Sequence, residues 1–312
     1  PLALFMLFLL TKSVTAGTIL YLNQTVAAQA RALQNEAAVL MTTHLPPNLP
    51  DQENAAGLYR GASIIFEDDD AFQEFLQDNA QSFADPITQE EIAFLTRHVE
   101  TLELLRQAAA RPVCRFTRDY PRPSVDMLLP EIQFFRNAAR ILAVSAHYQV
   151  SIGNMPAALR DVSSIIKMSL HASSEPILIS GLVGLSIDAI AIDVLIDILP
   201  FIDADDLVLL KSNDIYNFLS VPPSLTKNIY GEEAFGLTIF SIFGTGKFEQ
   251  WQLASLLIDD LHVPDSFYQQ NSFLNPALAA YRIFLFPQDL AVYQQTMRSY
   301  QRVAESSDSY AA

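Results

Sequence analysis

The chain has 312 residues, half of them hydrophobic, which is enough for a large buried core. Its formal net charge of -16 disfavours nucleic-acid binding, because the phosphates would be repelled rather than neutralised. Cys114 is the only cysteine, which excludes an intramolecular disulfide and a cysteine-based metal cluster. With 10 glycines and helix-period patterns along its length, the sequence predicts an all-α protein.

An apolar segment opens the chain over residues 1–22 and includes Leu4, Phe5 and Phe8. A cleavable signal peptide, a signal-anchor and a buried helix are the three interpretations. We expect a single membrane-spanning anchor, with the rest of the chain on the periplasmic side. In lipid, Lys12 has to snorkel, pair with an acidic group of a partner or mark a shorter span.

The anchor is expected to continue as a helical stalk over residues 23–44, with Leu33, Ala37 and Leu40 on one face. A proline-rich linker over 45–52 then separates the stalk from an α-helical domain over 53–312. Within this domain, one helix is predicted from Asp51 and another from Thr88 to about Ala110, where Thr88 and Glu91 have the spacing of a capping box.

The segment 111–130 is predicted to be a loop because four prolines exclude a long helix. Its arginines, Arg111, Arg115, Arg118 and Arg122, concentrate positive charge in an acidic protein. They are candidates for docking an acidic partner or an anionic headgroup, and the alternative is pairing with the chain's own carboxylates. They could also favour a thiolate at Cys114, for which a structural thiol is the alternative.

Two helices hinged at Gly153 and Asn154 form the predicted centre of the domain. The inward face of the second helix is expected to consist of Leu159, Val162, Ile165, Ile166 and Met168. Gly153 suits a left-handed helix end, Asn154 a cap, and Pro156 a first helical turn. This unit resembles a tetratricopeptide (TPR) repeat, although an ordinary helical hairpin is equally compatible. We therefore expect a TPR-like solenoid or bundle.

The segment 175–199 has the length of a membrane span, but three aspartates interrupt it. We expect it to be the central helix of a bundle, apolar on most faces, rather than a second span. Further helices are predicted over 203–218, 225–243, 250–261 and 287–304, followed by a frayed tail.

No catalytic motif stands out. The histidines are scattered, neither a Gly-x-Ser-x-Gly elbow nor a dinucleotide fingerprint occurs, and the paired acids are as frequent as 35 acidic residues produce by chance. His98, Glu100 and Glu103 are weak candidates for a metal site, and we favour the interpretation that they lie on a solvated helix face. We expect neither enzymatic activity nor a cofactor or metal ion.

Several blocks of the chain resemble a family of uncharacterised, single-span helical proteins common in planctomycetes and related bacteria. The resemblance rests on the apolar N-terminal span, the proline-rich joint and the blocks Glu53–Arg60, Ala138–Arg140, Gly153–Leu159, Glu175–Gly184 and Gly231–Leu237. It implies an envelope location and a repeat-like helical fold, and it implies no activity. Glu233 departs from the family pattern, which often has Arg there.

The leading hypothesis is a membrane-anchored helical scaffold that serves as an accessory subunit of a larger envelope complex. Its expected partners are the protein subunits of that complex and the lipid bilayer. One alternative is an enzyme or small-ligand binder with a pocket near Arg136, Arg140 and the loop 115–122. The other is a simple monomeric membrane tether.

Overall fold

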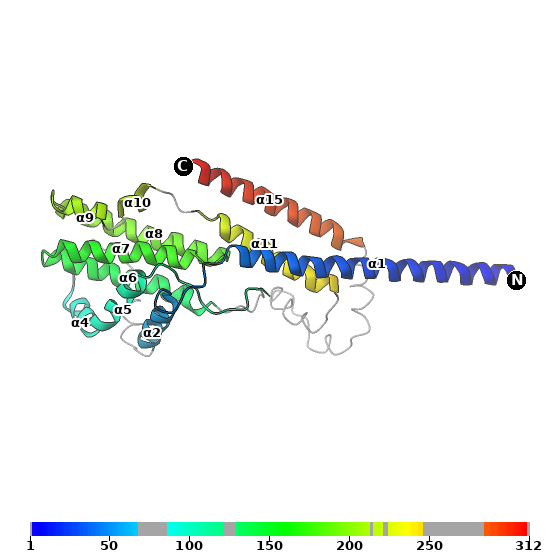
Figure 1. The fold of residues 1–312 in the computed structure, drawn as a ribbon, viewed down its shortest axis with the longest axis horizontal. Helices are drawn as coiled ribbons and strands as arrows, with labels where there is room; N and C mark the ends of the chain where they lie inside the picture. Colours follow the sequence, from blue (N-terminus) through cyan, green and yellow to red (C-terminus); the bar gives the residue numbers. More distant parts are fainter. Residues whose placement is uncertain are drawn as a thin grey trace. The chain divides into compact units, whose positions relative to one another are not determined.

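The computed structural model describes residues 2–67, 86–121, 129–212, 215–220, 224–245 and 284–310. These residues form α-helices, one short 3-10 helix and one isolated β-bridge, between Asn54 and Val113 (Figure 1). The all-α prediction is confirmed for this part of the chain. The chain divides into two compact units: unit 1 comprises 1–43, 119–127 and 230–303, and unit 2 comprises 44–118, 128–229 and 304–312.

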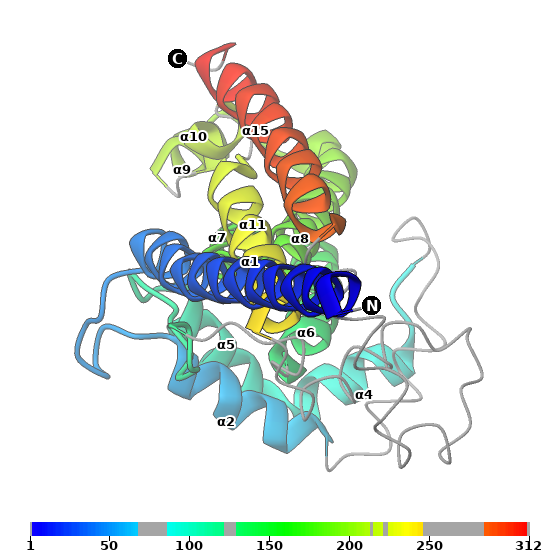
Figure 2. The same cartoon turned by 90° about the vertical axis from the view of Figure 1, so that its right-hand side faces the viewer.

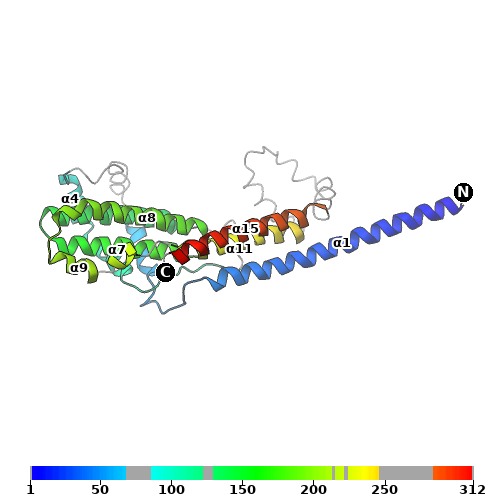
Figure 3. The same cartoon turned by 90° about the horizontal axis from the view of Figure 1, so that it is seen from above.

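In unit 2, three long helices run side by side and form the centre of the fold (Figures 1 and 3). They are α6 (Pro130–Ser151), α7 (Met155–Ser173) and α8 (Leu178–Ile198). α7 contacts both neighbours, and its inward residues Leu159, Val162 and Ile165 are completely buried. This confirms the predicted inward face of the second central helix.

The turn between α6 and α7 has the predicted backbone. Gly153 adopts a positive φ of 75°, in the left-handed region where a side chain would be strained. Pro156 lies in the first turn of α7, as expected. Asn154 occupies the capping position, but its side chain makes no capping hydrogen bond and instead donates to Gln149 Oε1.

Smaller helices pack on this core. α2 (Ala56–Glu67) lies beside α5 (Val99–Ala109) and also contacts α6 (Figure 2). The predicted capping box is present at the start of α4 (Gln89–Arg97), where Thr88 and Glu91 exchange their hydrogen bonds. The predicted helix over 88–110 is interrupted at His98, which separates α4 from α5. α9 (Asp206–Ser212) and α10 (Ile215–Ser220) contact α7, where one helix was predicted.

Unit 1 contains α1 (Leu2–Thr43), most of α11 (Thr226–Thr245) and most of α15 (Phe286–Tyr310). Among the α1 side chains that the structure describes, the buried ones recur at helical spacing: Val26, Ala30, Leu33, Ala37 and Met41. The predicted packing face of the stalk is thus confirmed at Leu33 and Ala37. α15 continues through most of the tail that was predicted to fray.

Close approach of the unit 1 helices depends on glycine. A Cβ atom built on Gly244 would lie 2.5 Å from Ala30 Cβ, so α1 and α11 touch where neither has room for a larger side chain. Likewise, a Cβ atom on Gly236 would lie 1.9 Å from the Tyr293 hydroxyl. That hydroxyl donates to the carbonyl oxygens of Glu232 and Glu233, which ties α15 to α11.

The expectation of a membrane span over 1–22 is not met by any helix in the described part of the chain, since none there is both long and apolar enough to cross a bilayer. Leu4, Phe5, Phe8 and Lys12 lie within α1, and their side chains are outside the described part. The predicted helix over 250–261 also lies outside it.

Candidate functional site

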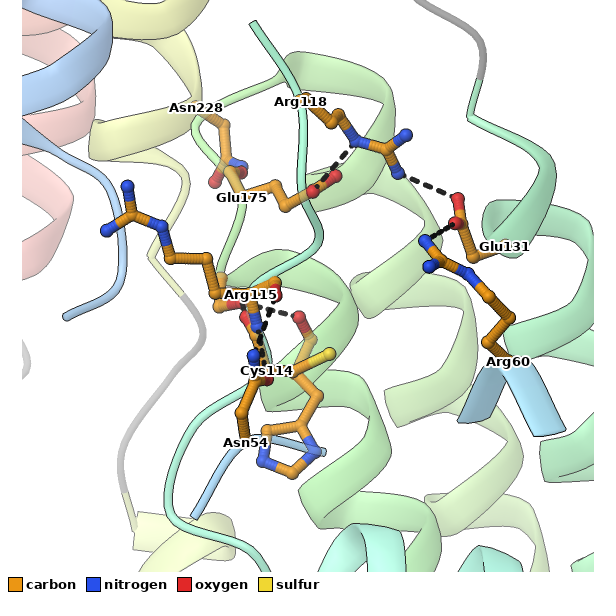
Figure 4. A network of polar contacts seen from close by, with 10 residues as sticks. Asn54, Arg60, Cys114, Arg115, Arg118, Glu131, Glu175 and Asn228 are labelled. Atoms are coloured by element: carbon orange, nitrogen blue, oxygen red, sulfur yellow. Dashed lines mark hydrogen bonds and ion pairs between the residues drawn. The ribbon is translucent and has the colours of Figure 1, made fainter. Parts of the chain in front are cut away.

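The arginine-rich loop of unit 2 is held mainly by the chain itself (Figure 4). Arg118 is almost completely buried, and its guanidinium donates to Glu131 Oε2 at 2.7 Å and to Glu175 Oε1 at 3.1 Å. Glu131 also pairs with Arg60 at 3.5 Å. Because burying a charge is costly unless it is paired, these contacts attach the loop to the start of α6 and to the α7–α8 turn. For Arg118, the structure therefore supports the second interpretation, in which the arginine pairs with the chain's own carboxylates.

The neighbouring loop residues have backbone partners. Asn54 forms a pair of hydrogen bonds with the backbone of Arg115, donating from Nδ2 to its carbonyl and accepting at Oδ1 from its amide (Figure 4). Arg115 Nη1 donates to the carbonyl of Pro46 in the linker at 2.8 Å. Arg122 lies outside the described residues. Partner docking by these arginines stays a prediction.

Cys114 is a buried structural thiol. Burial raises the pKa of the thiol, and the nearby carboxylates of Glu175 and Glu131 raise it further, whereas Arg118 acts in the opposite direction. The proximity of arginines therefore does not produce a reactive thiolate here, since the same arginine is neutralised by two carboxylates.

A second buried ion pair links α5, α6 and α7. Arg106 binds Asp161 through two nitrogens, Nε to Oδ1 at 2.6 Å and Nη2 to Oδ2 at 3.1 Å. Ser145 adds a hydrogen bond to Asp161 Oδ2 at 2.7 Å. Asp161 is completely buried, so this arrangement satisfies a charge that has no access to water. The three side chains thereby connect the three helices.

The residues proposed for a metal site or a ligand pocket do not converge. His98 is buried and packs against the rings of Phe94 and Phe66, with centroid distances of 4.4 and 5.3 Å. Among the described residues, no three His, Cys, Asp or Glu side chains are placed to hold a metal ion. Arg136 is exposed, and neither it nor Arg140 is among the residues that line a pocket found around His44, Arg111 and Lys227.

The feature that sequence reasoning missed is an exposed apolar stripe along α8, here called the α8 seam. Its members follow one another at intervals of three and four residues, as in a heptad repeat: Leu182, Leu185, Ala189, Ile192, Ile196 and Leu199. Leu182, Ile192, Ile196 and Leu199 are 46%, 40%, 58% and 55% exposed. The spacing was readable in the sequence, but the helix is apolar on its other faces too, which hid the stripe.

The opposite face of α8 is buried in unit 2 through small residues. A Cβ atom on Gly181 would lie 2.7 Å from Asn228 Cγ and from Leu225 Cδ2, and one on Gly184 would lie 2.8 Å from Ser173 Cβ. Asn228 donates to the carbonyls of Glu175 and Ile177 and so holds the turn that precedes α8. The segment 175–199 was expected to be the central helix of a bundle. One face of α8 is buried as expected, whereas the face that carries the seam lies on the surface.

The segment that carries the seam is acidic. Residues 178–210 contain six aspartates and neither lysine nor arginine. Asp193 is exposed and follows Ile192 directly, beside the seam. An apolar stripe with acidic flanks can bind an apolar helix face whose own flanks are basic.

Comparison with known proteins adds no family to this picture, since no protein-family model, curated protein or solved structure matches the chain.

Proposed function

We propose that this chain is an α-helical interaction module that binds an amphipathic helix of a partner protein along the α8 seam. The observation that carries the proposal is the heptad spacing of large apolar side chains on the exposed face of a well-packed helix. Soluble surfaces tolerate scattered apolar residues, but a continuous stripe is typical of a binding site. A seam with a period of 3.5 residues matches a helix better than a loop or a strand.

The charge pattern narrows the choice of partner. A second copy of this chain would bring the acidic flank near Asp193 against its equivalent, and like charges across an interface cost free energy. A helix with leucine or isoleucine in its own seam and lysine or arginine beside it would complement both features. The proposed occupant is therefore a basic, amphipathic helix from a different protein.

The cellular role that we propose for this module is that of an accessory subunit in a larger envelope assembly. The apolar segment over 1–22 supports a tether at the membrane, and the contact of Ala30 in α1 with Gly244 in α11 supports a packed connection to that tether. The TPR-like arrangement is supported by the α6–α7 hairpin with Gly153 at its turn. These points extend the binding proposal, and the test below does not depend on them.

The test uses two synthetic helical peptides with leucines at heptad spacing, one flanked by lysines and the other by glutamates. Fluorescence anisotropy should give saturable binding of the lysine peptide and binding at least about tenfold weaker for the glutamate peptide. Ile196→Glu should weaken binding of the lysine peptide by about tenfold or more, because it buries a charge within the seam, at its most exposed large apolar residue.

The matched control is Ile64→Glu, which places the same charge at an apolar residue of α2 that is 56% exposed. It should leave the affinity unchanged. Equal affinities for the two peptides, or equal losses in the two variants, would refute the proposed binding mode. In the cells that produce the protein, Ile196→Glu but not Ile64→Glu should release it from any larger particle seen on sizing.

A further inference from the structure

A second candidate site lies in unit 2, apart from the α8 seam. It is a pocket of about 450 Å³ formed by the linker after α1, the loop after α5, one face of α7 and the start of α11. This volume lies within the range of small-molecule sites in proteins. The walls combine apolar residues, among them Leu45, Pro46, Val113 and Leu170, with several basic side chains.

The charge of the pocket is opposite to that of the whole chain. His44, Arg111, Lys167, His171 and Lys227 all line it, whereas no Asp or Glu is among the lining residues that the structure describes. In a chain with a formal net charge of -16, a cavity with basic groups on several sides and no lining acid is an unusual concentration of positive charge.

One of the lining groups, the His171 ring, already has internal hydrogen-bond partners. His171 lies between two partners, with Nδ1 2.9 Å from the Tyr59 hydroxyl and Nε2 3.1 Å from the carbonyl oxygen of Arg111. Burial lowers the pKa of His171 to about 4, so the ring is neutral near pH 7. A neutral ring that accepts from Tyr59 at Nδ1 and donates to Arg111 from Nε2 satisfies both contacts. His171 therefore builds the wall and contributes no charge.

Lys227 and His44 are neighbouring basic groups in the lining of the pocket, close enough for the charge of Lys227 to act on the His44 ring. Burial lowers the pKa of Lys227. Burial also lowers the pKa of His44, and the positive charge of Lys227 lowers it further. Within the described part of the chain, no carboxylate forms an ion pair with Lys227, in contrast to Arg106 and Arg118. A partly buried cation beside a second basic group is costly, and an anion bound between them would offset that cost.

We propose that this pocket binds a small organic anion, with its carboxylate or phosphate group at Lys227 and His44 and its apolar body against Leu45, Pro46 and Leu170. Lys167 is a further basic wall residue and adds to the attraction. The site is independent of the α8 seam, so that the failure of either proposal leaves the other in place.

The experiment is isothermal titration calorimetry on the full chain with four probes: phenyl phosphate, benzoate, inorganic phosphate and phenol. We expect saturable binding of phenyl phosphate or benzoate, and whichever binds more tightly assigns the anionic group. Phenol should bind much more weakly because it lacks the charge. Inorganic phosphate should bind more weakly than phenyl phosphate because it lacks the apolar body.

The variant Lys227→Gln should weaken binding of the preferred probe by roughly tenfold to a hundredfold, the usual effect of losing a charged hydrogen bond. Lys227→Arg should retain most of the affinity, which separates loss of charge from loss of fold. Arg97→Gln, which removes an exposed basic residue outside the pocket, is the matched control and should bind as the wild type does.

Three results would overturn the proposal. They are a lack of saturable binding by either organic anion, equal binding of phenol and phenyl phosphate, and an equal loss of affinity in Lys227→Gln and Arg97→Gln. A folded Lys227→Gln variant with unchanged affinity would also overturn it, and circular dichroism establishes whether the variant is folded.

Discussion

Removing Arg106 is expected to destabilise unit 2 strongly, because Asp161 would keep its charge in a site with no access to water. In the native protein this completely buried carboxylate binds two nitrogens of Arg106 and the hydroxyl of Ser145. Arg106→Met leaves only the hydroxyl. Breaking one partner out of a buried ion pair costs about 3–5 kcal/mol. At about 2–4 °C per kcal/mol for a unit of this size, the melting temperature should fall by roughly 6–20 °C.

The assay is thermal and urea unfolding followed by circular dichroism, on three variants. The double variant Arg106→Met with Asp161→Leu removes both charges and should recover most of the loss, because an apolar pair of similar volume replaces a buried ion pair without a large cost. Arg160→Met is the surface control. Its side chain is 56% exposed and pairs with Glu103 at 3.6 Å, so the loss should stay within about 1 kcal/mol.

The reasoning would be refuted if Arg106→Met lowered the melting temperature and the free energy of unfolding no more than Arg160→Met does. It would also be refuted if the double variant were less stable than Arg106→Met alone. The first result would mean that other polar groups or water stabilise the Asp161 carboxylate when Arg106 is absent. The second would mean that the two side chains stabilise the fold through packing and not through charge.

Two further changes test the packing around α8. Burial raises the pKa of Asp188 to about 6, so the folded protein holds a proton that the unfolded chain releases near pH 4, and stability should fall as the pH rises between these values. In urea unfolding, the free energy of unfolding of Asp188→Asn should therefore match that of the wild type below pH 4 and exceed it above pH 6. A constant difference between the two proteins across this pH range would contradict the assignment. Gly181→Ala should cost about 1–3 kcal/mol, because its Cβ atom would lie 2.7 Å from Asn228 Cγ, and an unchanged urea midpoint would show that this contact relaxes freely.

The described helices were predictable wherever local chemistry alone defined them. The capping box of Thr88 and Glu91, the left-handed Gly153 and the proline in the first turn of α7 each depend on residues within one turn of helix. Their geometry is the same in any fold, so the sequence pattern was sufficient. The break at His98 was missed because no glycine or proline marks it.

The candidate sites were harder to predict. The loop arginines were singled out correctly as unusual, but the sequence could not tell that Arg118 pairs with two carboxylates, Glu131 and Glu175. These partners lie 13 and 57 positions away along the chain. Likewise, Lys227 and His44 come from distant segments, and neither has a neighbouring motif that would mark it as part of a pocket.

By itself, the sequence determined the all-α class of the described residues, the helical hairpin at Gly153 and the acidic character of the chain. Period, propensity and charge are properties of neighbouring residues and survive without a tertiary context. Only the tertiary structure decided which face of α8, a helix that is apolar on most faces, is buried and which basic residues share the pocket. Those outcomes depend on long-range packing, in which glycines such as Gly181 let one face approach its neighbours while the α8 seam remains on the surface.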